Sequence, residues 1–309
     1  MSNITQREHS IAGFAHSISV FTVEGARPGP ALALLGGVHG DELEGPVALS
    51  RLLAGLDPAS LTGRLIVVPV CNPDAVAAGT RISRADAGNL ARSFPGDSEG
   101  KPTERLAALL AAEVIAKANA LVDLHSGGVA LASAFFAGYG DTGPMAAEAR
   151  AMAEAFGAPV IWRHGEPASG RTLSEAYARG IPSIYVEANG GTFPDETVIE
   201  AYREGALRVM ARLGHIAAAP PAPAVEPLRL VGHGNLDAAI MAPASGFLDC
   251  RAAPLQQLAA GEAAATITGL DGRVLAYIAP EIAGRVVFAR RSRWVEKGEI
   301  VLAMAQDDR

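Results

Sequence analysis

A histidine and a glutamate three residues apart follow the first strongly apolar stretch of the chain. Residues 31–35 (ALALL) have the length and composition of a buried strand, and Gly36 and Gly37 follow directly. Glycine allows the sharp turn by which a chain leaves a sheet. His39 and Glu42 should therefore lie on a loop past the carboxyl end of the strand, where ligands bind in open α/β sheets. Imidazole nitrogens and carboxylate oxygens are good zinc ligands, so we expect this pair to hold a catalytic metal.

Two further polar side chains follow apolar stretches in the same way. His125 comes after residues 120–124 (ALVDL), and Glu187 comes after residues 181–186 (IPSIYV). A catalytic zinc ion commonly has three protein ligands and keeps its fourth position for water, so His125 completes a candidate ligand set with the first pair. Glu187 is then the separate carboxylate that takes a proton from water and returns it to the leaving group. Burial at the end of an apolar strand should raise its pKa toward neutrality.

Each part of this pattern also has a structural interpretation. A single His-x-x-Glu is a weak metal signal, and the Asp-Leu-His segment that ends at His125 is also explained by a helix cap or a hydrogen-bonded core histidine. Glu187 is equally explained as a structural carboxylate that pairs with an arginine. The joint pattern favours a functional site, because every candidate follows a strand and has glycine close by.

Strands alternate with helices over the first two thirds of the chain. The apolar patterns predict strands over residues 18–23, 31–35, 63–70, 120–124, 159–161 and 181–186. Helical spacing predicts helices over residues 46–56, 103–119, 145–156, 173–179 and 198–213. This alternation predicts an α/β fold with a mixed, mostly parallel sheet and helices on both faces.

A change of texture divides the chain. Residues 217–227 (AAAPPAPAVEP) have the composition of a linker, which separates a predicted catalytic domain over residues 1–216 from residues 228–309. Short β-like runs between glycine-containing turns predict a small all-β domain in the second part. This part resembles the barrel-sandwich modules of biotinyl and lipoyl carriers, but Lys297 lacks the flanking pattern of an acceptor lysine. We expect it to have a structural or oligomerisation role.

The polar, glycine-rich loop over residues 78–100 carries several arginines. Long loops in compact domains are often functional. Arg84 and Arg92 have the chemistry to bind a carboxylate bidentately or to stabilise an oxyanion. A solvated loop with incidental arginines is the alternative, but the loop lies between strands whose ends carry the metal candidates.

Four segments together carry a family resemblance. GGVHGDE, NLARSFPG, DLHSGG and IYVEANGG resemble the succinylglutamate desuccinylase/aspartoacylase family, relatives of the zinc carboxypeptidases. The resemblance covers residues 32–213, with a family-like β domain after it. It implies one zinc ion per chain, held by His39, Glu42 and His125, with Glu187 as general base and acid.

The same resemblance implies roles for the arginine loop. Arg84 would polarise the scissile carbonyl and stabilise the oxyanion, while Arg92 would bind the substrate's carboxylate, with Asn89 in the same substrate-binding loop. The family often has Asp-Leu-Asn-Arg where this chain has Asn-Leu-Ala-Arg. Ala91 lacks the amide that would assist Arg92, so this departure concerns the choice of substrate and leaves the metal chemistry intact.

Composition narrows the partners and the location. The chain has 309 residues and a formal net charge of −7, which argues against nucleic acid or an anionic membrane as partner. Two cysteines form no disulfide framework, so a reducing cytoplasm is expected. The first ten residues do not have the pattern of a signal peptide, and no apolar run approaches the ~20 residues of a membrane span.

These observations lead to one main functional hypothesis and two alternatives. We expect a zinc-dependent amidohydrolase that deacylates a small N-acyl amino acid or related metabolite with a carboxylate. A metallocarboxypeptidase that acts on short peptides is the first alternative, and it differs in where the free carboxylate lies relative to the scissile bond. A non-catalytic small-molecule binding protein on the same scaffold is the second, but the presence of all three ligand candidates and the base counts against it.

Overall fold

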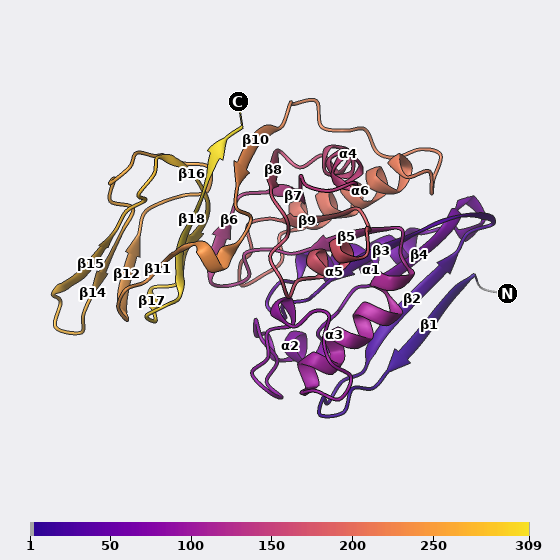
Figure 1. Cartoon of the computed structure of the whole chain (residues 1–309), viewed down its shortest axis with the longest axis horizontal. Coiled ribbons are helices and arrows are strands. Elements are labelled where there is room, and N and C mark those ends of the chain that lie inside the picture. The colour runs from indigo at the N-terminus through magenta and orange to yellow at the C-terminus, as the bar shows by residue number, and fades with distance from the viewer. Residues whose placement is uncertain (1–2, 309) are drawn as a thin grey trace.

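The computed structural model describes residues 3–308, which build one large mixed sheet with helices packed against it and a smaller sheet beyond (Figure 1). The helices are α1 (Glu44–Gly55), α2 (Pro73–Ala78), α3 (Pro102–Glu113), α4 (Ala146–Phe156), α5 (Thr172–Ala178) and α6 (Glu196–Arg212). Short 3-10 turns are η1 (Pro58–Ser60), η2 (Leu90–Arg92), η3 (Ile115–Lys117) and η4 (Leu236–Ala238). The first ten strands are β1 (Ile4–His9), β2 (Ile18–Glu24), β3 (Arg27–Gly36), β4 (Thr62–Val68), β5 (Ala120–Leu124), β6 (Leu131–Ser133), β7 (Phe136–Gly140), β8 (Val160–His164), β9 (Ser183–Glu187) and β10 (Leu228–Gly232). The others are β11 (Ile240–Met241), β12 (Gly246–Cys250), β13 (Gln257–Leu258), β14 (Ala265–Thr268), β15 (Val274–Ile278), β16 (Gly284–Arg290), β17 (Trp294–Val295) and β18 (Ile300–Asp307).

The centre of the large sheet is parallel. The strand order β4-β3-β5-β9 joins neighbours that all run in the same direction. Antiparallel strands flank this centre, with β2 beside β4 and β7 beside β9. The sheet is therefore mixed with a parallel core, as the alternation of strands and helices predicts.

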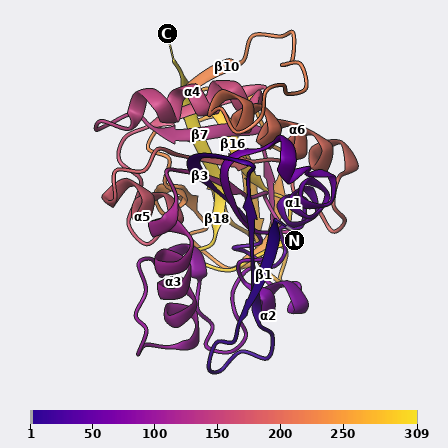
Figure 2. The same ribbon diagram turned by 90° about the vertical axis from the view of Figure 1, so that its right-hand side faces the viewer.

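Alternate side chains of β3 face two different apolar cores. Leu32 and Leu34 pack in the core that contains α1, α4 and α6, whereas Ala33 and Leu35 pack in the core that contains α3 and α5. Figure 2 shows α4 and α6 above the central strands and α3 below them. Because a strand points successive side chains to opposite sides, a continuous apolar run is buried on both faces. The prediction of helices on both faces is confirmed.

The five predicted helices correspond to α1, α3, α4, α5 and α6, with their ends displaced by a few residues and residues 115–117 forming η3 instead of a continuation of α3. Strand β8 is longer than the sequence pattern indicates and runs through Trp162 to His164. No helix in the described part of the chain is both long and apolar enough to span a bilayer.

The region after residues 217–227 is joined to the large sheet by hydrogen bonds. Strand β10 pairs in parallel with β8, and β6 from the first region pairs with β16 from the second. A separate four-stranded sheet, in the order β15-β14-β12-β17, extends to the left in Figure 1. The β-rich character of this region agrees with the sequence. Its first strand, β10, is hydrogen-bonded to β8, so the large sheet continues beyond the proline-rich segment.

Candidate active site

Four of the predicted site residues lie at the carboxyl ends of three adjacent strands. His39 follows β3, His125 follows β5, and Glu187 is the last residue of β9. Glu42 lies in the turn before α1. Because these strands are parallel neighbours, their carboxyl ends meet at one edge of the sheet, which is where open α/β sheets bind ligands.

Glycines allow the loop after β3 to turn and to pack closely. Gly37 has a φ of +61°, which favours glycine. A Cβ atom on Gly40 would lie 2.0 Å from the carbonyl carbon of Ala75 in α2. The loop that carries His39 is therefore held against α2 by a contact that only glycine permits.

His39, Glu42 and His125 converge on one small volume. One possible ligand atom from each side chain lies within 4.8 Å of the others. His39 and Glu42 are each only 2% exposed. Two imidazoles and one carboxylate at this spacing could hold a metal ion, and they are the residue types of one kind of catalytic zinc site.

Hydrogen bonds orient both imidazoles. His39 donates from Nδ1 to the carbonyl oxygen of Arg81 at 3.0 Å, so its Nε2 carries the free lone pair. Nε2 of His125 lies 3.0 Å from Oδ2 of Asp123, and its Nδ1 lies 3.0 Å from Oε2 of Glu42. A carboxylate on the far nitrogen fixes the tautomer of a metal-binding histidine, and Asp123 occupies that place for His125.

The surroundings of the cluster favour the neutral form of His39 and the ionised form of Glu42, which are the forms that bind a metal ion. Burial and the positive charge of Arg81 lower the pKa of His39 to about 3, so its imidazole is neutral. Burial alone would raise the pKa of Glu42, but nearby His39, His125 and Arg81 outweigh it and hold that pKa at about 2. Arg81 also donates from Nη1 to Oε1 of Glu42 at 2.8 Å.

Glu187 lies beside this cluster as a separate carboxylate. It lines the same pocket as His39 and His125 and is 8% exposed. Its Oε2 atom is buried and has no hydrogen-bond partner among the described residues. Burial and the negative charge of Glu42 raise the pKa of Glu187 well above its usual value, which suits a group that takes up and releases a proton.

The arginine loop differs from the sequence-based expectation. Arg84 is exposed and is not among the residues that line the pocket, whereas Arg81 does line it. The structure therefore brings Arg81, and not Arg84, beside the cluster. Asn89 caps the start of η2, where its side chain accepts a hydrogen bond from the backbone N–H of Ala91 at 3.1 Å, so it orders the loop from outside the pocket. Arg92 lines the pocket as expected.

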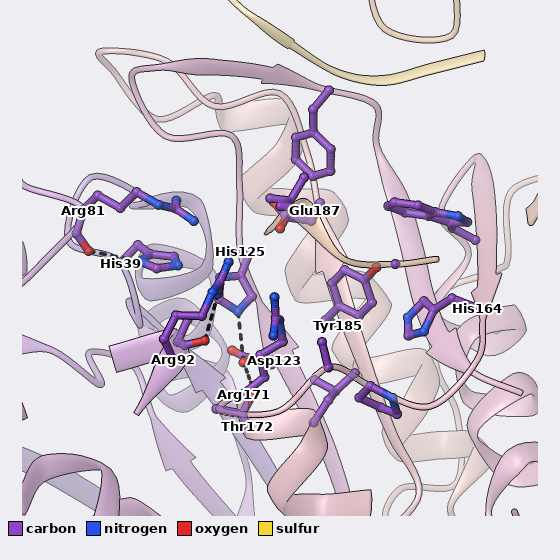
Figure 3. Close-up of a pocket in the computed structure, with 18 residues that line it drawn as sticks. His39, Arg81, Arg92, Asp123, His125, His164, Arg171, Thr172, Tyr185 and Glu187 are labelled. Atoms are coloured by element: carbon purple, nitrogen blue, oxygen red, sulfur yellow. Dashed lines mark hydrogen bonds and ion pairs between the residues drawn. The ribbon is translucent and has the colours of Figure 1, made fainter. Parts of the chain in front are cut away.

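Other pocket residues come from elements that the motifs do not include. Figure 3 shows Arg171, Thr172, Tyr185 and His164 around the same space as the cluster. Arg171 and Thr172 stand at the start of α5, and Thr172 donates to Oδ2 of Asp123 at 2.5 Å. Asp123 carries a local signal, since it lies two residues before His125 at the end of an apolar strand.

The second region also reaches this pocket. Gly234, Leu236 and Phe288 line it together with residues of the first region. A pocket that two regions build cannot be read from either region's motifs alone.

Together, the fold and the site define an α/β protein whose His₂Glu cluster lies at the carboxyl edge of the sheet, with a buried carboxylate beside it. The profile of the succinylglutamate desuccinylase/aspartoacylase catalytic domain matches residues 28–213. The chain belongs to this family.

Solved structures of similar proteins extend over the whole chain. A succinylglutamate desuccinylase/aspartoacylase from Rhodobacter sphaeroides is 27% identical, with a TM-score of 0.88 over 100% of this chain and 97% of that one. The product-bound ectoine utilization protein EutE (DoeB) from Ruegeria pomeroyi is also 27% identical, with a TM-score of 0.88 over 99% of this chain and 96% of that one. The second region is therefore part of the shared architecture.

A curated relative matches a shorter segment. The N-alpha-acetyl-L-2,4-diaminobutyric acid deacetylase of Halomonas elongata is 43% identical over 133 residues, which are 42% of this chain and 39% of that protein. The match thus spans about two fifths of the relative's length. This relative is by name a deacetylase of a small N-acetylated diamino acid.

Proposed function

We propose that this chain is a zinc-dependent deacylase that hydrolyses the amide bond of a small N-acyl amino acid. The observation that carries the proposal is the convergence of His39, Glu42 and His125, with Glu187 left unpaired beside them. A ligand set and a free base in one pocket are the two parts that metal-assisted hydrolysis needs.

The donor atoms suit zinc. Nε2 of His39, Nδ1 of His125 and a carboxylate oxygen of Glu42 would hold the ion, since these atoms are left for it by the hydrogen bonds to Arg81 and Asp123. Bound zinc supplies a Lewis acid that polarises a carbonyl and lowers the pKa of a water molecule to about 7.

The remaining groups would handle protons and charge. Glu187 takes the proton from the attacking water and then delivers it to the departing amine nitrogen. Arg81 is the cation nearest the cluster and would stabilise negative charge on the carbonyl oxygen. Arg92 and Arg171 line the wall of the pocket and would attract the substrate's carboxylate.

The relatives support an acetyl group as the first acyl group to test. The Halomonas elongata protein is by name a deacetylase of an N-acetylated diamino acid.

Both cysteines of this chain are free, which agrees with the cytoplasmic location predicted from the sequence.

A substrate panel tests the proposal directly. Protein loaded with one equivalent of zinc is assayed against N-acetyl, N-succinyl and longer N-acyl amino acids, and against dipeptides. We expect turnover of N-acyl amino acids that stops on zinc removal and returns on zinc addition. Glu187→Gln should keep its zinc and lose at least about 10²-fold in rate, because general acid–base catalysis contributes that much.

Other outcomes would reject the proposal. Preferential cleavage of dipeptides would identify a carboxypeptidase. Binding of N-acyl amino acids by the zinc-loaded protein without any turnover would identify a binding protein on a hydrolase scaffold. Undiminished turnover by Glu187→Gln would remove Glu187 from the mechanism.

A further inference from the structure

Two arginines of the pocket share one carboxylate from the second region. Arg92 donates from Nε to both carboxylate oxygens of Asp237, at 3.1 and 3.0 Å, and from Nη2 to Oδ1 at 2.7 Å. Arg171 donates from Nη2 to Oδ2 at 3.0 Å. Asp237 thus lies between two guanidinium groups that both line the pocket.

The two arginines need an anion between them. Both guanidinium groups lie within hydrogen-bond distance of one carboxylate, so the two like charges are close together; burial and the positive charge of Arg92 lower the pKa of Arg171. Partial burial opposes ionisation of Asp237, but Arg92 and Arg171 outweigh it and lower its pKa. The carboxylate of Asp237 is therefore ionised and offsets one of the two positive charges.

The segment around Asp237 is held in place on the pocket wall. Asp237 lies in η4, and Asn235 accepts from its backbone N–H at 3.0 Å. The same Asn235 oxygen accepts from Nη2 of Arg171 at 2.6 Å. Leu236, between them, lines the pocket. These contacts fix the carboxylate relative to the arginines, although its side chain is 53% exposed.

The count of charges limits what the wall can bind. Among Arg92, Arg171 and Asp237, two guanidinium groups and one carboxylate leave one net positive charge, which matches the single α-carboxylate of an N-acyl amino acid. Asp237 is not itself among the residues that line the pocket, but its carboxylate is bonded to two arginines that are, so its charge would repel a second substrate carboxylate bound at those arginines. An amide of the same shape would meet no such repulsion.

We propose that Asp237 is a specificity-determining residue that makes the pocket select N-acyl amino acids with one carboxylate and reject those with two. This inference rests on the proposed function for its class of ligand. It assigns to the second region a part in substrate choice: the region contributes a fixed negative charge that is bonded to the two arginines of the pocket wall.

Two isosteric ligands test the inference by binding alone. N-acetyl-L-asparagine and N-acetyl-L-aspartate differ by one negative charge. Their dissociation constants are measured by calorimetry on zinc-loaded Glu187→Gln protein, at an ionic strength of about 0.05 M so that screening is weak. With Asp237 present, we expect the asparagine derivative to bind at least tenfold more tightly. In Asp237→Asn, the two constants should come within threefold of each other.

Matched variants separate charge from structure. Asp249→Asn removes a carboxylate from β12 that is similarly exposed and pairs with Arg251, so it should keep the tenfold preference. Asp237→Glu keeps the charge and should also keep the preference. Circular dichroism checks that each variant is folded. If a variant fails to fold, the preference of the protein with Asp237 intact for N-acetyl-L-asparagine over N-acetyl-L-aspartate still tests the inference.

Each outcome is decisive. Equal or tighter binding of N-acetyl-L-aspartate with Asp237 present would overturn the inference, as would an unchanged preference in folded Asp237→Asn, or the absence of binding by both ligands. Discrimination in binding without hydrolysis by the unmutated protein would sustain the inference and reject the proposed function. Hydrolysis of both ligands at similar efficiency by the unmutated protein would overturn the inference and sustain the proposed function.

Discussion

Nε2 of His125 lies 3.0 Å from Oδ2 of Asp123, and this contact leaves Nδ1 as the nitrogen that faces Glu42. Asp123 is fully buried and also accepts a hydrogen bond from Thr172. A buried carboxylate that is itself held by a hydroxyl keeps the ring in one orientation. The geometry of the proposed ligand set therefore depends on a residue that does not belong to it.

We predict that Asp123→Asn weakens zinc binding by about 10- to 100-fold, the usual effect of losing such a supporting group. Thr172→Val keeps the shape of the side chain but removes its hydroxyl, and should cause a smaller loss. Competition with a chromogenic chelator measures both affinities. Equal zinc affinity in Asp123→Asn and the unmutated protein would show that the His125 ring is held by other contacts.

The two arginines at positions 81 and 84 should differ sharply in function. Arg81 lies 2.8 Å from Glu42 and lines the pocket, whereas Arg84 is exposed outside it. We expect Arg81→Met to lower kcat by about 10²- to 10³-fold, as loss of an oxyanion-stabilising donor does. Arg84→Met should leave kcat within about twofold, since surface substitutions away from a site have small effects.

Steady-state kinetics on the best substrate of the panel compare the two variants. A large loss in Arg84→Met together with a small one in Arg81→Met would mean that the loop rearranges when substrate binds. The zinc content of both variants is measured in parallel, because Arg81 also contacts a proposed metal ligand.

Gly40 should tolerate no side chain. A Cβ atom there would lie 2.0 Å from the carbonyl carbon and 2.1 Å from the carbonyl oxygen of Ala75, which are backbone atoms and cannot move aside alone. We expect Gly40→Ala to lower the free energy of unfolding by more than about 2 kcal/mol, in the range of overpacked sites, and to weaken zinc binding.

Gly55 provides the matched control. It lies at the end of α1, and no atom within 4 Å would meet an added Cβ. Gly55→Ala should stabilise the protein by up to about 1 kcal/mol, because alanine loses less conformational freedom in a helix. Urea unfolding measures both variants, and similar stability of the two would refute the close packing of the loop against α2.

Asp86 should stabilise the loop in a pH-dependent way. Its carboxylate accepts hydrogen bonds from the N–H and the hydroxyl of Thr103, at 2.8 and 2.6 Å, and from the N–H of Gly88 at 2.9 Å. Burial opposes ionisation, but these bonds outweigh it and lower the pKa of Asp86 in the folded state. A carboxyl with a lowered folded pKa stabilises the protein above its unfolded pKa and loses that effect as the pH falls through the folded value.

We therefore expect Asp86→Asn to lower the free energy of unfolding by about 1–2 kcal/mol at pH 7. The difference from the unmutated protein should shrink below about pH 4, where the aspartate begins to be protonated. Urea unfolding at pH 7 and again below about pH 4 measures this difference in the free energy of unfolding. A difference that is equal at both would show that the ionised form of Asp86 has no special role.

Much of the fold is local in origin and could be predicted. The alternation of apolar stretches along the chain gave five of the helices and most strands of the central sheet, because buried strands and amphipathic helices leave periodic patterns. Strand β10 could not be placed in this way. It pairs with β8 across some 60 residues of chain, and no local pattern specifies the partner of a strand.

The candidate site residues could be found for the same reason, since His39, His125 and Glu187 lie at the ends of apolar strands or within three residues of them. The sequence could not show whether Arg81 or Arg84 lies in the pocket, because an irregular loop has no periodic pattern of apolar residues that indicates which side chain points inward.

The sequence alone determined the apolar strands that lead to the site, the glycine turns after them and the types of side chain that these turns carry, because these depend on neighbours within a few residues. The tertiary structure decided which distant groups meet: Asp123 behind His125, Arg81 beside Glu42, and Asp237 between two arginines. The pair of Arg92 and Asp237 joins positions 145 residues apart. Only the folded path of the chain brings such charges together, so the chemistry of the cluster follows from local sequence and the character of the pocket wall from long-range packing.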